Sequence, residues 1–395
     1  MNNEDAHKVH HAYECAPYPS RQALRAGAGS PAVPTNWVNA VAWPGVALRD
    51  GARILVAGCG TGHEAARLAV DFPNAEVTAV DFSAASIAVA QSMKAEGFPE
   101  RIRFEVADLT TDDLGGPYDF ISCNAVADYV PDSSALLNTL SRALAPQGVL
   151  YLGVNSPTHP ASRIAHSLTT LGVGHDRFDD DPTQRAALRL AAAIMGQDGK
   201  IPGFERASAA YLTVEMFPAF AHHRSLEAWL PLATSAGLHL RSTLNTAFAL
   251  TGIADSDLPQ LYGLDRGAVA RFVEGLRFNH MLPMLLTKSA PEEPPWDDLD
   301  RLHSWRPRSH PCIGPERIPP LEDDWMTQRF IAIQAPGLPE LRLPLSAYML
   351  EIYRRADGTQ SLSELRASLA PTVPDEHVRA ALFRGYHASV LYMAP

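Results

Sequence analysis

Lysine and paired cysteines are scarce in this sequence of 395 residues. The lysines are Lys8, Lys94, Lys200 and Lys288, so arginine supplies most of the 33 basic residues against 44 acidic ones. The resulting net charge of -11 argues against a broad phosphate-binding surface, because non-specific affinity for nucleic acids comes mainly from cation–phosphate contacts. The four cysteines lie far apart without a C-x-x-C pair, which leaves a disulfide framework and a cysteine zinc site unsupported.

Long hydrophobic runs are absent as well. No stretch approaches the ~18 consecutive apolar residues that a membrane span needs. The first residues, Met-Asn-Asn-Glu-Asp, are polar and acidic, so we expect no signal peptide and a cytoplasmic location. Apolar residues still make up 46% of the chain, which is ample for a globular core, and the length predicts two or three domains.

Strand-like and helix-like runs alternate from residue 50 to residue 155. Strands are expected at 53–57, 76–80, 101–106, 118–123 and 149–154, and two more at 238–244 and 278–287. This spacing predicts βαβ units and therefore a Rossmann-like α/β fold, with a parallel sheet covered on both faces.

Composition divides the chain into units of different character. Residues 1–35 are expected to form a leader or cap, 36–289 the α/β domain with a helical insertion at about 157–236, 290–322 a linker, and 323–395 a small domain. Helices are expected within this small domain at 346–355, 361–369 and 375–386, and within the α/β domain at 258–264 and 269–276.

The most informative segment is a glycine-rich turn, Gly58-Cys59-Gly60-Thr61-Gly62, which follows an apolar strand. Glycines remove Cβ atoms, so the backbone can turn tightly and approach a ligand closely. Asp81 ends the next strand, where a carboxylate can accept hydrogen bonds from two ribose hydroxyls, and Phe82 beside it could stack on an adenine. Asp108 follows the third strand and can reach the exocyclic amine of an adenine.

Two ligands fit this layout, and a tight turn without any ligand is the third interpretation. A dinucleotide fold needs G-x-G-x-x-G, but His63 stands at the last position and disfavours close packing under a pyrophosphate. The G-x-G-x-G spacing of Gly58, Gly60 and Gly62 suits a nucleoside with an amino-acid tail. We therefore expect S-adenosylmethionine as the cofactor.

These segments resemble the class I S-adenosylmethionine-dependent methyltransferases. Residues 56–62 look like the glycine motif of that family, 80–83 like its ribose motif, 107–108 like its adenine motif, and 144–149 like its signature after the fourth strand, with Gln147 in place of a common glycine. The resemblance covers about residues 50–155 and implies a seven-stranded sheet. It also implies that the cofactor site is lined by Gly58, Cys59, Gly60, Gly62, Asp81, Phe82, Asp108, Leu109 and Asn124.

A narrower resemblance concerns the leader. Residues 13–21 are similar to a bacterial subfamily with a Y-E-x-x-P-Y-P leader, and 222–224 resemble its E-H-R segment with His222 in place of Glu. Members are mostly described only as methyltransferases, so no substrate is implied. Tyr13, Tyr18 and Arg21 could fold over the cofactor, with Arg21 clamping a carboxylate; the alternative is a tyrosine–proline packing plug.

Methyl transfer is an in-line displacement at a sulfonium, so the protein mainly positions the nucleophile and, where needed, removes a proton. Asp128 and Tyr129 are candidate acceptor contacts, and His223 is a candidate general base because histidine titrates near neutral pH. An exposed lid histidine is the alternative for His223. The histidines at 7, 10 and 11 and the acidic run 176–181 are expected to be solvated, so no metal site is predicted.

The C-terminal block resembles winged-helix modules, in particular the small peptide-recognition modules of peptide-modifying enzymes. Its third helix carries only Arg379 and Arg384 as permanent cations, which disfavours DNA binding. A structural role or homodimer formation stays open beside peptide or protein recognition.

Three functions follow from these patterns. The leading one is methyl transfer from S-adenosylmethionine to an N, O or S atom of a small metabolite or a peptide side chain. The second is a non-catalytic S-adenosylmethionine-binding regulator or partner subunit. The third, nucleic-acid methylation, is disfavoured by the net charge and by Asn124-Ala-Val-Ala, which stands where N-P-P-Y or D-P-P-Y would orient an exocyclic amine.

Overall fold

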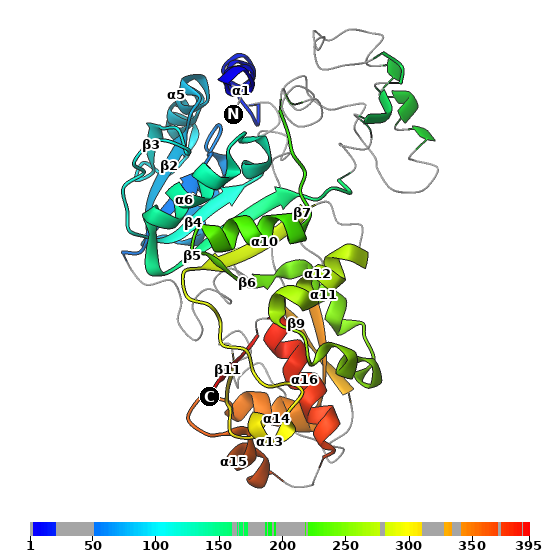
Figure 1. Cartoon of the computed structure of the whole chain (residues 1–395). Coiled ribbons are helices and arrows are strands. Elements are labelled where there is room, and N and C mark those ends of the chain that lie inside the picture. Colours follow the sequence, from blue (N-terminus) through cyan, green and yellow to red (C-terminus); the bar gives the residue numbers. More distant parts are fainter. Residues whose placement is uncertain are drawn as a thin grey trace.

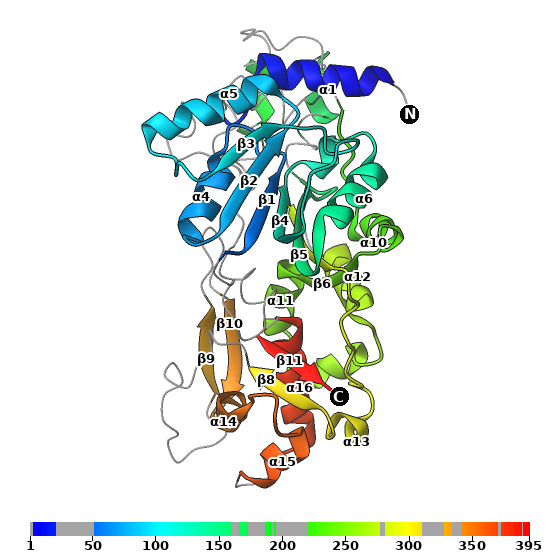
Figure 2. The same ribbon diagram turned by 90° about the vertical axis from the view of Figure 1, so that its left-hand side faces the viewer.

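The computed structural model consists of a sheet domain, built from residues up to 289, and a C-terminal part, residues 290–395, below it in Figure 1. It describes residues 3–20, 51–159, 220–276, 281–309, 328–333, 341–369, 373–388 and 390–395, with a few more between 164 and 218. Helix α1 (Asn3–Cys15) lies at the end of the sheet domain that is remote from the C-terminal part (Figure 2).

Seven strands form the large sheet. They are β1 (Arg53–Ala57), β2 (Glu76–Asp81), β3 (Arg103–Val106), β4 (Tyr118–Asn124), β5 (Leu144–Asn155), β6 (His239–Thr243) and β7 (Met281–Thr287). Their order is β3-β2-β1-β4-β5-β7-β6, and β7 alone runs antiparallel to its neighbours. Each strand expected from the sequence is present, which confirms a Rossmann-like sheet, although β5 begins earlier than expected. The sheet is mixed and not wholly parallel as predicted, because β7 enters between β5 and β6 in the opposite direction. The chain order reverses between β1 and β4, and ligands of open α/β sheets bind outside the carboxyl ends of the strands at such a point.

Helices cover both faces of this sheet. One face carries α4 (His63–Asp71), α5 (Ala84–Met93) and α11 (Leu244–Thr251), and the other carries α6 (Ser133–Ala143), α10 (Leu226–Ser235) and α12 (Arg266–Leu276). Short 3-10 helices are η1 (Lys94–Glu96), η2 (Ala127–Tyr129) and η5 (Asp255–Leu261); η5 replaces the α-helix expected at 258–264.

Helix α11 was not expected from the sequence. Its Leu244 and Phe248 pack with the sheet, whereas Ala247 and Leu250 belong to the core of the C-terminal part. A helix that is buried on two sides lacks the polar stripe by which an amphipathic helix is recognised.

Among its described residues, the C-terminal part contains two small antiparallel strand pairs and four helices. Figure 2 shows how they are arranged. Strand β8 (Arg306–Ser309) pairs with β11 (Leu391–Ala394), and β9 (Gln328–Ile333) pairs with β10 (Leu341–Ser346). The helices that the structure describes there are α13 (Leu299–Leu302), α14 (Ala347–Arg355), α15 (Leu362–Ala367) and α16 (Asp375–His387). The three helices expected from the sequence are present, and a reciprocal capping box between Ser361 and Glu364 starts α15. The winged-helix likeness of this part stays a prediction.

A continuous hydrophobic core joins the two parts. Leu258 and Tyr262, which lie between β6 and β7, share one cluster with Tyr353 and Phe383 of the C-terminal part. Trp296 joins the same cluster: it is only 2% exposed, and its ring meets those of Phe383 and Tyr386 edge-on. Residues 290–309, expected to be linker, are therefore built into the junction. The prolines and acidic residues of this segment suggest a linker, and its buried anchors, Trp296 and Leu302, are not evident from composition.

Most of the helical insertion expected at 157–236, with the acidic run 176–181, lies outside the described residues. The described end of it is α10, which contacts α6 and α12 and buries Trp229 completely. Helix α10 thus covers a face of the sheet, and the lid expected from the rest of the insertion stays a prediction. Within the described ranges, no helix is long and apolar enough to cross a membrane.

Replacing Trp296 tests whether the junction is structural. We expect Trp296→Ala to lower the free energy of unfolding by about 3–5 kcal/mol, because it empties a buried aromatic site between the two parts. Chemical denaturation followed by circular dichroism measures this. The control is Phe272→Ala, since Phe272 is 50% exposed, and a loss no larger than in this control would contradict the assignment.

Candidate functional site

The glycine-rich turn connects β1 to α4, and all three of its glycines adopt positive φ angles. These are 75° at Gly58, 50° at Gly60 and 87° at Gly62. A Cβ atom on Gly58 would overlap the side chain of Val126, and one on Gly62 would meet Phe104 and Ala90 at 2.9 Å. Glycine is thus required here both by backbone conformation and by space.

Asp81 holds this turn in place from the end of β2. Its Oδ2 accepts the N–H of Gly60 at 2.8 Å, and its Oδ1 accepts the N–H of Ser83 at 2.9 Å. Burial raises the pKa of the Asp81 carboxyl, and the two backbone hydrogen bonds oppose that shift. Each carboxylate oxygen keeps accepting capacity beyond its backbone contact.

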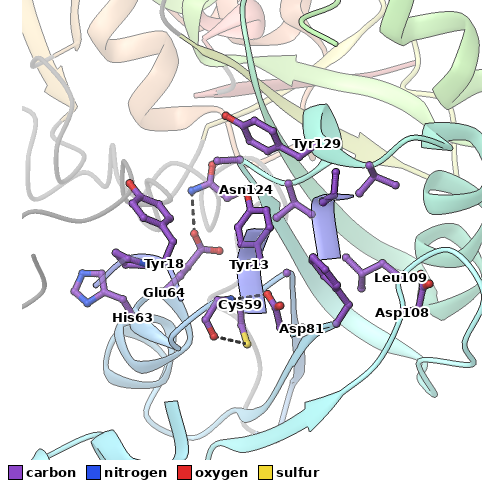
Figure 3. Close-up of a pocket in the computed structure, with 18 of the residues that line it drawn as sticks. Tyr13, Tyr18, Cys59, His63, Glu64, Asp81, Asp108, Leu109, Asn124 and Tyr129 are labelled. Atoms are coloured by element: carbon purple, nitrogen blue, oxygen red, sulfur yellow. Dashed lines mark hydrogen bonds between the residues drawn. The ribbon is translucent and has the colours of Figure 1, made fainter. Parts of the chain in front are cut away.

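A cavity opens beside this turn at the carboxyl ends of the central strands, and we call it the strand-end cavity (Figure 3). Most residues that the sequence analysis assigned to the cofactor line it, and so does one acceptor candidate. These residues are Tyr13, Tyr18, Gly58, Cys59, Gly60, Asp81, Phe82, Asp108, Leu109, Asn124 and Tyr129. Gly62 lies behind the cavity, where α4 packs on its neighbours, and Arg21 lies outside the described residues.

The leader is fastened to the turn by backbone contacts. The N–H of Thr61 donates to the carbonyl of Tyr18 at 3.2 Å, and its hydroxyl donates to the carbonyl of Pro19 at 2.7 Å. The ring of Tyr13 meets Phe82 edge-on at 5.6 Å between centroids. Tyr13 thus packs on Phe82, and both tyrosines line the cavity, so the packing and the cofactor-binding interpretations of the leader both stay open.

Asp108 and Leu109 close the side of the cavity beyond β3. Oδ1 of Asp108 accepts the N–H and the hydroxyl of Thr110, at 2.8 and 2.6 Å. The loop is thereby fixed with a carboxylate and the buried Leu109 against the same cavity.

Glu64 is a cavity residue that sequence reasoning missed. It lies in the first turn of α4, where its carboxylate accepts the hydroxyl of Ser122 and, at 2.9 Å, the amide of Asn124 (Figure 3). Burial raises the pKa of this carboxyl, and the two side-chain hydrogen bonds oppose the shift. An acid in the first turn of a helix is ordinary because it complements the helix dipole, so nothing in the pattern indicated that Glu64 turns inward.

The three residues predicted to contact the acceptor or take its proton, Asp128, Tyr129 and His223, lie in different places relative to the cavity. Tyr129 lines the cavity, and its hydroxyl accepts the side-chain amide of Asn155 at 2.9 Å. Asp128 does not line it: the residue is wholly buried, and its carboxylate accepts the N–H of Asn155 at 2.6 Å. This differs from the acceptor contact expected for Asp128, because its carboxylate braces the loop instead.

His223 lies on the segment before α10 and also does not line the cavity. Its ring centroid is 6.4 Å from that of His159, and burial lowers its pKa, so the imidazole is neutral at pH 7. The neighbouring His222 contacts Ser133 Oγ at 2.7 Å, and burial lowers its pKa to about 4. Across the described ranges, no group of three or more metal-ligating side chains is placed to hold an ion.

Comparisons with known proteins agree with this geometry. Residues 48–168 match the family described as a methyltransferase domain. The trans-aconitate 2-methyltransferase of Deinococcus radiodurans is 38% identical over 122 residues, 31% of this chain and 44% of that protein. The malonyl-[acyl-carrier protein] O-methyltransferase of Bacillus cytotoxicus is 37% identical over 98 residues, 25% of this chain and 33% of that protein.

Residues 48–168 of the chain are therefore similar to a methyltransferase domain. The predicted methyltransferase likeness of residues 50–155 is confirmed by this match. The matched region spans less than half the length of the two curated relatives. The structure of PKMT2 from Rickettsia typhi superposes with a TM-score of 0.54 at 16% identity, over 91% of this chain and 75% of that one, which shows a shared fold.

Gly60 offers a direct test of the turn in this methyltransferase domain. A Cβ on Gly60 would overlap the carbonyl oxygen of Tyr18, so we expect Gly60→Ala to push the leader away and weaken S-adenosylmethionine binding at least tenfold, about 1.4 kcal/mol. Gly51→Ala is the matched control, since Gly51 has a φ of 74° but nothing within 4 Å of the place where its new methyl group would stand. Calorimetry measures both, and equal losses would show that backbone strain alone is responsible.

Proposed function

We propose that this protein is an S-adenosylmethionine-dependent methyltransferase whose acceptor is an N, O or S atom of a small metabolite or a peptide side chain. The observation that carries the proposal is the strand-end cavity, where the glycine turn, Asp81 and Asp108 face one space at the topological switch point.

The charge of the cavity supports a cationic ligand. Its described lining includes the carboxylates of Glu64, Asp81 and Asp108 but only one permanent cation, Arg67, whose Nε lies 3.6 Å from Asp71. Burial lowers the pKa of His63, which leaves that imidazole neutral. Such a lining suits a ligand with an ammonium and a sulfonium group, and it would repel the pyrophosphate of a dinucleotide.

The residues present fit S-adenosylmethionine, which when bound supplies an activated methyl group on a sulfonium. Asp81 would accept the ribose hydroxyls, Asp108 the exocyclic amine of the adenine, and Phe82 would pack on the ring. The glycines let the backbone approach the amino-acid tail. The leader closes the cavity over these groups and limits the access of water.

On the acceptor side, Tyr129 is the described candidate with a side chain at the cavity. Its hydroxyl is oriented by Asn155, so it could position an acceptor group by a hydrogen bond. His223, whose imidazole is neutral at pH 7, is the candidate general base for the proton that the acceptor loses. Asp128 acts as a positioning residue through Asn155.

The printed names of the relatives guide the choice of acceptors. The names of two relatives contain trans-aconitate and malonyl-[acyl-carrier protein], which are both acids. Oxygen atoms of small acids therefore come first among the acceptors to test. Nucleic acid ranks last, because the described lining is acidic. The relatives are bacterial, so we propose the bacterial cytoplasm as the location.

Asp81→Asn tests the cofactor assignment. An asparagine amide in place of the carboxylate removes the charge and one acceptor, so we expect S-adenosylmethionine binding to weaken by about 1.5–3 kcal/mol. The control is Asp297→Asn at an exposed position of the C-terminal part. Calorimetry that shows no binding to the unaltered chain would overturn the cofactor role.

Glu64→Gln tests the charge argument. S-adenosylhomocysteine carries one positive charge fewer than S-adenosylmethionine, so we expect the substitution to weaken binding of the methyl donor more than binding of the demethylated product. In the unaltered protein, donor affinity should fall as the pH is lowered through the raised pKa of Glu64, and this fall should shrink in Glu64→Gln. Glu76→Gln, at an exposed end of β2, is the control, and equal weakening for both ligands would contradict the argument.

Turnover is tested separately from binding. Incubation of the protein with a cell extract and isotopically labelled S-adenosylmethionine, followed by mass spectrometry, should reveal one labelled acceptor. Tight cofactor binding without any labelled product would favour the non-catalytic regulator instead.

A further inference from the structure

A second cavity lies at the junction between the sheet domain and the C-terminal part, and we call it the arginine cavity. It is bounded by β6 and the start of α12 on one side and by β8, β11 and the end of α16 on the other. Its volume of about 470 Å³ falls in the range of small-molecule sites. Figure 2 shows β8, β11 and α16 at the end of the molecule remote from α1.

Four arginines line this cavity: Arg241 from β6, Arg266 from α12, and Arg306 and Arg308 from β8. Such a concentration is notable in a chain with a net charge of -11. The acids on its described lining are Glu292 and Asp357, and Asp357 already accepts the N–H and hydroxyl of Thr359 at 2.8 and 2.6 Å. The cavity is therefore positively charged.

Arg266 has a clear structural role. Its Nε lies 3.4 Å from Glu293 Oε1, its guanidinium donates to the carbonyl of Arg241, and it stacks over Tyr386 at 4.0 Å from the ring centroid. These contacts satisfy its charge and fix the wall of the cavity.

The other three arginines differ from Arg266. Among the residues that the structure describes, Arg241, Arg306 and Arg308 form no ion pair. The described hydrogen bond of the Arg306 side chain goes to the carbonyl of Thr359. Within the described part of the chain, three guanidinium groups without a direct ion pair thus border one space. Carboxylates act on them only at longer range: Glu293 on Arg241, Glu364 on Arg306 and Asp357 on Arg308.

Arg241 is the most informative of them. Its guanidinium lies 5.5 Å from the ring centroid of Tyr392, and the charges of Arg266 and Glu293 act on it with opposite sign. Burial, and then the charge of Arg266, lower its pKa. A cation that is partly withdrawn from water beside a like charge is costly unless an anion joins it.

We propose that the arginine cavity binds a small ligand carrying an oxyanion, either a phosphate or a carboxylate. The planar fork of a guanidinium matches both groups through two parallel hydrogen bonds. Arg241 and Arg308 supply forks from opposite sides of the junction, and Tyr392 provides an aromatic wall. A bound oxyanion would therefore link β6 of the sheet domain to β8 of the C-terminal part.

Titration of the full chain with inorganic phosphate and, separately, with citrate tests this site. Calorimetry in a low-salt buffer free of both anions should give saturable binding of at least one probe. A preference for one probe identifies the phosphate or the carboxylate as the recognised group. Because a ligand that binds only the folded protein stabilises it, the same probe should raise the thermal unfolding midpoint.

Variants locate the binding. Arg241→Gln and Arg308→Gln should each weaken it roughly tenfold, since each removes one charged fork. Arg103→Gln removes an equal charge on exposed β3, where Arg103 pairs with Glu105, and should leave binding unchanged. Arg308 is exposed, so its variant keeps the test decisive if Arg241→Gln fails to fold.

Two results would overturn the proposal. One is the absence of saturable binding of either probe to the unaltered chain. The other is equal binding by the unaltered chain and by Arg308→Gln, with circular dichroism confirming that the variant is folded. Neither result depends on S-adenosylmethionine. The anion-binding proposal can therefore fail while the proposed methyltransferase activity stands, and the methyltransferase proposal can fail while anion binding stands.

Discussion

The hydrogen bond from the N–H of Gly60 to the Asp81 carboxylate is the contact on which the site depends. It joins the turn after β1 to the end of β2. The same turn receives the leader, because the next residue, Thr61, donates to the carbonyls of Tyr18 and Pro19. One buried carboxylate thus sets the shape of the turn, the position of the leader above it and the accepting edge offered to a ligand.

The sheet and this turn were predictable because their signals are local. Short apolar runs, glycines that need positive φ angles and an acid at a strand end each act within a few residues. Features that depend on distant partners were not predictable. Glu64 turns inward because Ser122 and Asn124 on β4 donate hydrogen bonds to its carboxylate. Trp296 is an anchor only because Phe383 packs against it. Helix α11 could not be recognised from the sequence because it is buried on two sides and so lacks an amphipathic pattern.

The two cavities have opposite charges and different architectures. The strand-end cavity belongs to the sheet and gathers carboxylates around a glycine turn, which suits a cation. The arginine cavity exists only because the C-terminal part packs against β6 and α12, and it gathers guanidinium groups. The C-terminal part shares its core with the sheet domain, so a ligand in the second cavity would bear on how firmly the two parts are joined.

A crystal structure of the full chain with S-adenosylhomocysteine tests the central claim most directly. We expect the ligand to occupy the strand-end cavity, with its ribose hydroxyls on Asp81 and its adenine between Phe82 and Asp108. A ligand bound elsewhere, or a ribose without contact to Asp81, would contradict it.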